Sequence, residues 1–273
     1  MAETHGKTVF ALACHPDDIE FMMGGTLFLL KEAGCTLHFM NLANGCCGST
    51  ELDREETARV RREEGQNAAR MVGARFHESL ASDLEIFYSP ELIRKVTAVV
   101  RQIRPDIMLL PSPEDYMEDH MNTCRIGVTA AFSRCVPSYP TDPPTEATYQ
   151  DVVLYHALPY GLRDGLRRRI TPDFYVNIES VIDEKERMLA CHESQKTWLD
   201  QTQGLDSYLQ TMRDMSAEVA AGAVGAAGEE GAGGGRVGKY AEGWRRHSHL
   251  GFSAADIDPL VEILESYCAV NKE

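Results

Sequence analysis

Short apolar runs alternate along this chain with longer segments whose apolar residues recur at helical spacing. The runs at 9–13, 36–42, 75–77, 106–110, 151–155 and 174–178 have the length and composition of strands. The intervening pattern predicts helices at 53–72, 90–103 and 120–135, and a last helix at 254–267. Such alternation predicts an α/β, Rossmann-like fold of three layers, with a mostly parallel sheet and helices on both faces.

The length and the spacing of these elements predict a single domain over residues 1–273. The chain has 273 residues, of which 43% are hydrophobic, and no Pro- or Ser-rich linker divides it. One segment, 217–238, is rich in Gly and Ala and poor in large apolar residues, which predicts a flexible loop. Its position between polar motifs at 192–195 and 240–245 leaves an active-site lid as the alternative to a passive surface insertion.

Acidic and imidazole side chains follow two of the predicted strands. The first strand leads into His15-Pro16-Asp17-Asp18, and Asp119-His120 follows the strand at 106–110. A single stretch of this kind is more often turn chemistry, with Asp accepting backbone N–H groups. Two acid-His pairs at the carboxyl edge of one sheet, where ligands bind in open α/β folds, instead favour one metal site.

These residues belong to an ordered series of motifs that resembles the LmbE-like, or PIG-L-like, zinc deacetylases, which remove acetyl from N-acetylglucosamine groups. The first family motif is H-P-D-D-E after a strand, and here Ile19 separates Asp18 from Glu20. The later matches are Gly24-Gly25-Thr26, Arg61-Arg62-Glu63-Glu64, Asp119-His120, His192-Glu193-Ser194-Gln195 and Tyr240-Ala241-Glu242-Gly243-Trp244-Arg245. The bacillithiol-pathway deacetylases are the branch closest in pattern.

The chemistry of the residues agrees with this resemblance. Two imidazoles and a carboxylate, from His15, Asp18 and His120, give a divalent ion three ligands and leave a position for water. Zn²⁺ is the expected ion, and Fe²⁺ or another first-row metal suits the same ligands. Asp17 is the expected general base. The expected reaction releases acetate from an N-acetylated amino sugar and leaves a free amine.

Several further residues receive expected roles. The family's second motif, H-P-D-H, begins with a His that helps the oxyanion, whereas this chain has Met117 at that position. A thioether cannot donate a hydrogen bond, so Tyr116 or His192 is expected to supply the donor. Asp119 is expected to orient an imidazole.

Arg61 resembles the family position that contacts the polar aglycone of the substrate. The alternative for Arg61 is an i, i+3 pair with Glu64 on a solvated helix face. The sequence alone leaves both interpretations open.

The net charge limits the classes of partner that we expect, and the cysteines indicate the cellular compartment. A formal charge of −15 argues against nucleic acid or an anionic membrane as the partner. No apolar run reaches the roughly 18 residues of a membrane span. Eight cysteines without a secretory signal predict a cytoplasmic protein. A homo-oligomer is left open, and the expected partner is a small N-acetylated sugar.

Two other classes of protein fit the same residues. Two His and one carboxylate also form the facial triad of non-haem Fe(II) oxygenases, although the additional acid Asp17 fits water activation better. The departure at Met117 keeps a sugar-binding protein with impaired turnover as the other alternative.

Overall fold

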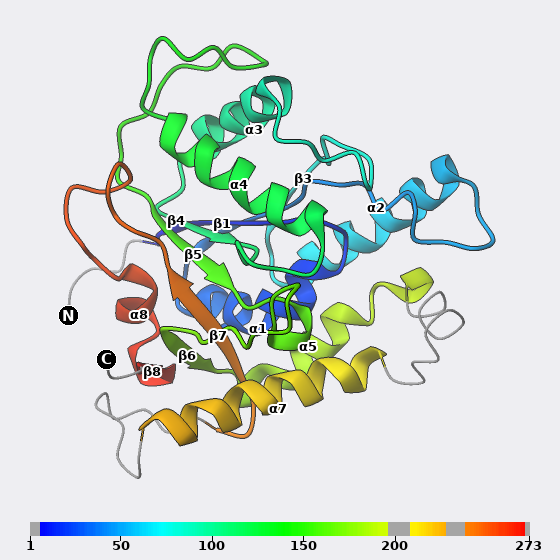
Figure 1. Ribbon diagram of the computed structural model, residues 1–273, viewed down its shortest axis with the longest axis vertical. Helices are drawn as coiled ribbons and strands as arrows, with labels where there is room; N and C mark the ends of the chain where they lie inside the picture. Colours follow the sequence, from blue (N-terminus) through cyan, green and yellow to red (C-terminus); the bar gives the residue numbers. More distant parts are fainter. Residues whose placement is uncertain (1–5, 196–207, 228–237, 271–273) are drawn as a thin grey trace.

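The strands form one twisted sheet, shown in Figure 1. The computed structural model describes residues 6–195, 208–227 and 238–270. In these residues the sheet has eight strands in the order β3-β2-β1-β4-β5-β7-β6-β8. The strands are β1 (Thr8–Ala13), β2 (Thr36–Asn41), β3 (Arg75–His77), β4 (Ile107–Leu110), β5 (Val153–Ala157), β6 (Phe174–Asn177), β7 (Ala241–Arg246) and β8 (Cys268–Val270).

The direction of the strands confirms the predicted mostly parallel sheet. The five strands from β3 to β5 in that order pair in parallel, whereas β7 pairs antiparallel to both β5 and β6, and β8 antiparallel to β6. The chain moves outward from β1 in both directions, to β2 on one side and to β4 on the other. The carboxyl ends of β1 and β4 therefore meet at a topological switch point, where open α/β sheets bind ligands.

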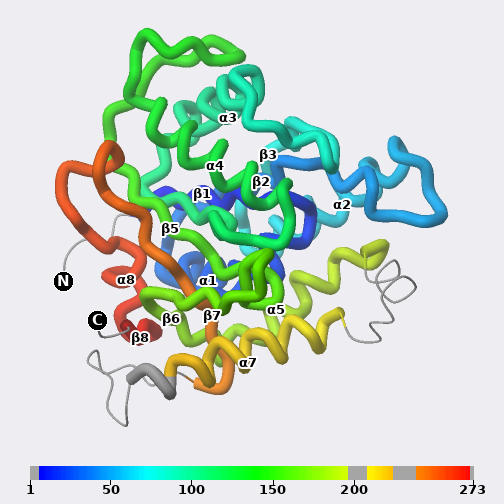
Figure 2. Tube along the Cα trace, viewed as in Figure 1, coloured from blue at the N-terminus to red at the C-terminus, as the bar shows by residue number. Residues whose placement is uncertain are grey.

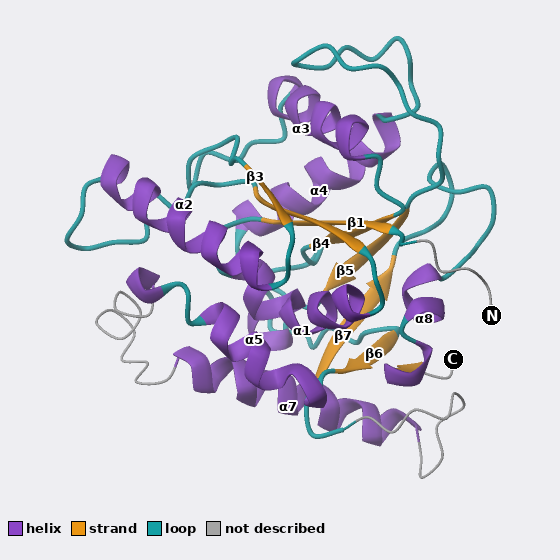
Figure 3. Ribbon diagram, turned by 180° about the vertical axis from the view of Figure 1, so that it is seen from behind, coloured by secondary structure: helices purple, strands orange, loops and turns teal. Residues whose placement is uncertain are grey.

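Helices cover both faces of the sheet (Figure 3). One face carries α1 (Asp18–Glu32), α2 (Arg54–Met71), α5 (Ile182–Leu189) and α7 (Tyr208–Ala227); the other carries α3 (Pro90–Ile103) and α4 (Glu118–Ser133). Strand β1 is buried on both sides: Val9 and Ala11 pack towards α1, whereas Phe10 and Leu12 pack towards α3 and α4. None of the described helices is long and apolar enough to cross a bilayer.

Local sequence signals set the ends of the predicted helices. The Asp53 side chain accepts a hydrogen bond from the Glu56 N–H at the start of α2. Ser89 does the same for Leu92 at the start of α3, where Pro90 occupies the first turn. These caps explain why the predicted helices at 53–72 and 90–103 agree closely with the structure.

The carboxyl-terminal region differs from the prediction of one helix over 254–267. Only α8 (Pro259–Ile263) is α-helical there, followed by a 3₁₀ turn at Glu265–Tyr267 and by β8. Asp258 is the N-cap of α8, and its side chain accepts a hydrogen bond from the Val261 N–H, so α8 begins directly after it. Pairing of β8 with β6 then takes residues 268–270 into the sheet.

Half of the Gly- and Ala-rich segment is also different from the expected loop. Residues 217–227 continue α7, and Val219, Ala220 and Ala223 are buried against Leu158 and Tyr175. Alanine is the best helix former, and its small side chain lets α7 pack closely on the sheet. The rest of the predicted loop, 228–237, lies outside the described residues. Figure 2 shows how α7 runs along the lower side of the molecule.

Candidate metal centre and active-site cavity

The loop that joins β1 to α1 holds the first group of polar residues. The Asp18 carboxylate accepts a hydrogen bond of 2.7 Å from the His15 backbone N–H, and Asn41 donates one of 2.6 Å to the His15 carbonyl. Asp17 adopts φ 118°, a backbone conformation that is costly for a residue other than glycine. The packing around this loop therefore fixes a strained turn, of the kind found at functional sites.

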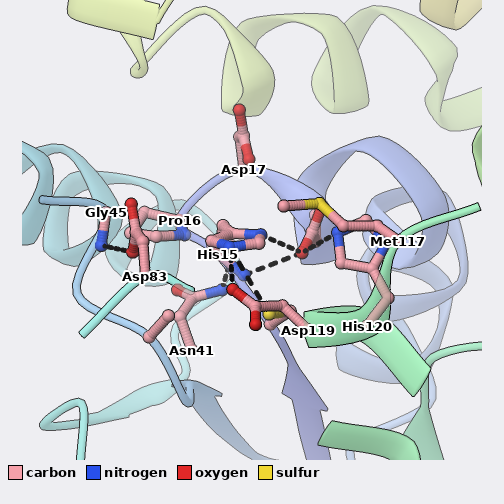
Figure 4. Close-up of polar contacts among 12 residues, drawn as sticks. His15, Pro16, Asp17, Asn41, Gly45, Asp83, Met117, Asp119 and His120 are labelled. Carbon is pink, nitrogen blue, oxygen red and sulfur yellow. Dashed lines mark hydrogen bonds and ion pairs between the residues drawn. The ribbon is translucent and has the colours of Figure 1, made fainter. Parts of the chain in front are cut away.

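His15, Asp18 and His120 meet at the carboxyl ends of β1 and β4. Figure 4 shows the His15 and His120 rings of this group. Oδ2 of Asp18 lies 3.6 Å from Nδ1 of His15 and 3.5 Å from Nε2 of His120. Donor atoms held tetrahedrally around one zinc ion at its usual bond lengths lie about 3.3–3.6 Å apart. The three side chains that the sequence predicted as ligands thus fit a single divalent ion.

A carboxylate contacts the outer nitrogen of each imidazole. Oδ2 of Asp119 lies 3.3 Å from Nε2 of His15, and Oδ2 of Asp115 lies 3.2 Å from Nδ1 of His120. Asp119 therefore contacts the distant His15 rather than its neighbour in sequence. Asp115 was not singled out from the sequence; its only signal is an acid in the loop after β4. Such contacts fix the tautomer and orientation of an imidazole that binds a metal.

The electrostatics of the cluster favour a cation. Burial would raise the pKa of Asp18, but His120 and His15 outweigh it and hold that pKa below its ordinary value. Burial raises the pKa of the nearby Cys14 thiol to about 11, so this sulfur is a neutral thiol. Cys14 belongs to the same group of possible ligand atoms. The ionised carboxylate and the two imidazoles form the donor set that suits a catalytic ion with an open position.

A cavity of about 360 Å³ opens above this cluster. Polar side chains and aromatic rings both line it, namely His15, Asp17, Asp18, Arg61, His120, Phe21, Tyr116, Tyr160 and Tyr208. The Phe21 ring packs against Tyr160 at 5.4 Å and against Tyr208 at 5.8 Å, measured between ring centroids. The cavity can thus hold a small molecule with both polar groups and an apolar face.

Asp17 lines this cavity beside the metal-type cluster. In Figure 4 its side chain points away from the His15 and His120 rings. Tyr208 donates a 2.8 Å hydrogen bond to its Oδ2, and Arg61 lies 3.3 Å from the same oxygen. Burial raises the pKa of the Asp17 carboxyl, with Arg61 opposing. A carboxylate of raised pKa accepts a proton more readily than an exposed one.

Arg61 is buried, so its alternative as a solvated partner of Glu64 is wrong. Only 3% of Arg61 is exposed, and its guanidinium donates to the Pro16 carbonyl. Glu64 instead accepts hydrogen bonds of 2.8 and 2.6 Å from the backbone and hydroxyl of Ser194. Arg61 lines the cavity, as contact with a substrate requires, and it also holds the loop that carries Asp17.

The two expected oxyanion donors lie in different environments. Tyr116 lines the cavity, and its ring meets His120 edge-on at 5.7 Å. Met117 lies on the same wall, so a side chain at this position reaches the cavity. His192, by contrast, is fully buried, and its Nε2 lies 2.6 Å from Glu20. Because His192 is not among the residues that line the cavity, its position does not support direct donation to a substrate.

The later motifs pack against the first. Glu242 on β7 accepts hydrogen bonds of 2.8 Å from the backbone of Gly25 and Thr26 in α1. A Cβ at Gly25 would lie only 2.6 Å from Ile178, so glycine is needed for this close approach. Trp244 donates a 3.0 Å bond to the Thr26 hydroxyl. The segment at 241–246, which was not predicted as a strand, therefore anchors the helix that begins at the metal-type cluster.

Comparisons with known proteins agree with this geometry. Residues 10–131 match the family model PIG-L, GlcNAc-PI de-N-acetylase. The chain is 28% identical to diacetylchitobiose deacetylase of Thermococcus kodakarensis over 196 residues, covering 69% of this chain and 70% of that protein. It is 24% identical to 4-oxalmesaconate hydratase of Pseudomonas putida over 201 residues, covering 71% and 76%.

A solved structure has the same fold over almost the whole chain. The N,N'-diacetylchitobiose deacetylase of Pyrococcus horikoshii superposes with a TM-score of 0.72 at 20% identity, covering 94% of this chain and 90% of that one. The special likeness to the bacillithiol branch stays a prediction. Because residues 10–131, which include both acid-His pairs, match this family model, the chain contains a PIG-L, or LmbE-like, domain.

Proposed function

We propose that this protein is a metal-dependent deacetylase that removes the acetyl group from an N-acetylglucosaminyl or related N-acyl sugar. The observation that carries the proposal is the meeting of His15, Asp18 and His120 at the base of a cavity that Asp17 also lines. The deacetylase among the relatives supports the same reaction. A cytoplasmic location is part of the proposal, because all eight cysteines are free thiols.

His15, Asp18 and His120 are the proposed ligands, and Zn²⁺ is the proposed ion. When bound, such an ion supplies Lewis acidity, which lowers the pKa of water from 15.7 to about 7 and polarises an acyl oxygen. Asp119 and Asp115 hold the two imidazoles with the correct nitrogen facing Asp18. The role of these two carboxylates is to keep the ligands oriented.

Asp17 is the proposed general base. Its buried carboxylate takes a proton from the attacking water and later passes one to the nitrogen of the departing amine. Arg61 and Tyr208 both contact Oδ2, which leaves Oδ1 as the atom for proton transfer. Both partners also hold the Asp17 side chain in one orientation within the cavity.

Tyr116 is the proposed donor to the oxyanion that forms during attack. Partial burial and the nearby Asp18 raise the pKa of Tyr116. Its phenol therefore stays protonated and can donate a hydrogen bond to the oxyanion. The aromatic wall formed by Phe21, Tyr160 and Tyr208 suits the apolar face of a sugar ring. Arg61 is the proposed contact for polar groups of the aglycone.

Acetate release from a panel of small N-acetylglucosaminides in the presence of added Zn²⁺ tests the proposal. The wild type should release acetate and amine in equal amounts, and dialysed His15→Ala should do so far more slowly because it retains less metal. Acetate release by the wild type should consume no oxygen, which separates it from a non-haem iron oxygenase. Metal binding without acetate release on any substrate would favour the sugar-binding alternative.

A hydratase is the second candidate, because one relative is a hydratase and Met117 departs from the deacetylase motif. Addition of water to a carbon–carbon double bond also needs a positioned base such as Asp17. The two activities differ in their products, since hydration releases no acetate. Incubation with a panel of unsaturated dicarboxylates therefore separates this candidate from the deacetylase. A hydratase would lower the ultraviolet absorbance of its substrate, because it removes the double bond.

A further inference from the structure

A second concave site of about 360 Å³ lies beside the loop that carries Asp115. We call it the arginine groove, and its charged and polar lining residues are Arg125, Arg245, Arg246, His156, His247, Thr129, Ser248 and Tyr88. Pro113 lines the groove, whereas Pro111 and Asp115 from the same loop line the active-site cavity. One loop thus contributes to both sites.

The groove concentrates arginines on a protein of negative net charge. None of the residues that line it is acidic, although the whole chain has a formal charge of −15. Two of its arginines form ion pairs with carboxylates outside the lining, Arg245 with Glu114 at 2.6 Å and Arg246 with Asp256 at 2.9 Å and Asp258 at 3.2 Å. The concentration of three arginines in one concave site is therefore local and is not a consequence of composition.

Arg125 is the arginine whose charge remains available. Among the described residues no carboxylate forms an ion pair with it, and its guanidinium lies 4.7 Å from the centre of the Tyr88 ring. Tyr88 is itself held by a 2.9 Å hydrogen bond between its hydroxyl and that of Thr129. Stacking of this kind restrains the guanidinium while leaving its N–H groups free to bind a ligand.

His247 presents a second group with an assigned orientation. Nδ1 of His156 lies 3.0 Å from the Pro111 carbonyl, which only accepts, so this nitrogen carries the proton. Nε2 of His156 must then accept from Nδ1 of His247, 2.9 Å away. With its proton on Nδ1, His247 leaves Nε2 as a hydrogen-bond acceptor; this nitrogen makes no hydrogen bond to the described residues and can accept one from a hydroxyl of a ligand.

We propose that the arginine groove binds a small molecule through an oxyanion, a phosphate or carboxylate group, which accepts hydrogen bonds from Arg125, while a hydroxyl such as that of hydrogen phosphate donates to Nε2 of His247. A planar guanidinium donates two parallel hydrogen bonds to such a group. The hydroxyls of Thr129 and Ser248, on the same lining, add neutral donors. A nucleic acid does not fit, because the formal charge of −15 on the whole chain repels a long polyanion.

Calorimetric titration of the full-length, zinc-loaded protein with inorganic phosphate, and separately with succinate, tests the proposal at one fixed ionic strength. We expect saturable binding of at least one of the two anions, and the stronger of the two identifies the source of the oxyanion. Arg125→Gln should weaken that binding by about tenfold or more, because the variant loses the charge-assisted hydrogen bonds of the guanidinium. Because Arg125 is exposed, the variant should keep the melting temperature of the wild type.

Arg70→Gln is the matched control. Arg70 is also exposed, lies at the end of α2 and forms no ion pair with a described carboxylate. It should bind the anion as the wild type does. Absence of saturable binding of both anions would overturn the proposal. Equal affinity in the wild type and Arg125→Gln would do the same, since the anion would then occupy the metal centre or another place. An equal loss of anion affinity in Arg70→Gln would also contradict it, because the weaker binding would then come from the overall charge of the protein.

An NMR measurement on the wild type tests the same proposal without depending on the folding of Arg125→Gln. The ring-proton NMR signals of His247 and His156 should shift saturably with the anion that calorimetry identifies. Unchanged signals for both rings at saturating anion would contradict the proposed position of the ligand.

Discussion

Nδ1 of His120 lies 3.2 Å from Oδ2 of Asp115, while Nε2 of the same ring faces Asp18 at 3.5 Å. The ring is thus held between a carboxylate of the proposed metal centre and one behind it. Asp115 also accepts a 3.0 Å hydrogen bond from the Met117 backbone through its other oxygen, Oδ1. The short loop before α4 therefore fixes both the helix start and the ligand.

Replacement of Asp115 by Asn should weaken metal binding by about 10- to 100-fold, which is typical when the partner of a ligating His is changed. The Asn side chain keeps an acceptor for the Met117 N–H but loses the negative charge that favours the correct His120 tautomer. Competition with a chelator of known zinc affinity measures the change.

Glu118→Gln is the control for Asp115→Asn. It removes the same charge from an exposed position in the first turn of α4, and it should leave zinc affinity unchanged. Equal zinc affinity in Asp115→Asn and the wild type would mean that the contact with His120 has no part in holding the metal.

Asp17→Asn should retain metal and lose about 100- to 10,000-fold in turnover, the contribution of a general base. The amide can still accept from Tyr208 and fills the same space, but it cannot take a proton from water. Zinc content after dialysis and the rate of acetate release give the two readouts. A variant with full activity would remove Asp17 from the mechanism, and one without zinc would make it a structural support of the ligands.

The sequence predicted the parts of the site that follow strands. His15 and Asp18 come directly after β1 and His120 lies in the helix after β4, so the parallel sheet alone brings them together. Tyr208 and Asp115 could not be found in this way. Tyr208 reaches Asp17 from α7, and nothing in the sequence around it distinguishes it from a core tyrosine.

Helix ends with local caps were also predicted well, whereas elements set by distant pairing were not. Asp53 and Ser89 mark their helices within a few residues. Strand β7 is buried from Ala241 to Trp244 and contains a Glu whose partners lie in α1, so no alternation of polar and apolar residues identifies it. Its pairing with β5 and β6 depends on residues far away along the chain.

The stability of the fold should fall as the pH is lowered from 7 to 5, in part through His156. Burial, with His247 and Arg245 nearby, lowers the pKa of His156 to about 4, below its ordinary value of 6.5. The unfolded chain therefore binds a proton near pH 6.5 that the folded protein does not bind until about pH 4. The stability that His156 contributes is fully present above the pKa of the unfolded state and is lost as the pH falls towards the pKa of the folded state. The expected loss from this residue is about 2 kcal/mol.

Urea unfolding at pH 7 and pH 5 tests this prediction in the wild type and in His156→Gln. The variant should be less sensitive to pH by that amount, because its amide can still contact Pro111 and His247 but does not titrate. His249→Gln, at a partly exposed position, should keep the wild-type dependence. An unchanged dependence in His156→Gln would show that His156 titrates alike in both states.

The last prediction concerns the oxyanion donor that Met117 cannot supply. Tyr116 lines the cavity beside His120, whereas His192 is buried against Glu20, so Tyr116 should be the donor. Tyr116→Phe keeps the ring contact with His120 and removes only the hydroxyl. It should slow acetate release by about 100- to 1,000-fold at saturating zinc, the usual cost of losing one oxyanion donor.

Two further variants make this test decisive. Met117→His restores a donor to the position that the related motif uses, so the double variant Tyr116→Phe, Met117→His should recover part of the lost rate. His192→Ala removes the partner of Glu20 and should reduce the stability of the fold, because it leaves a buried carboxylate without its hydrogen bond. If Tyr116→Phe keeps the parent's rate and Met117→His alone creates activity that the parent lacks, the donor has not moved to Tyr116. The protein would then be a sugar-binding protein whose turnover was lost with the histidine.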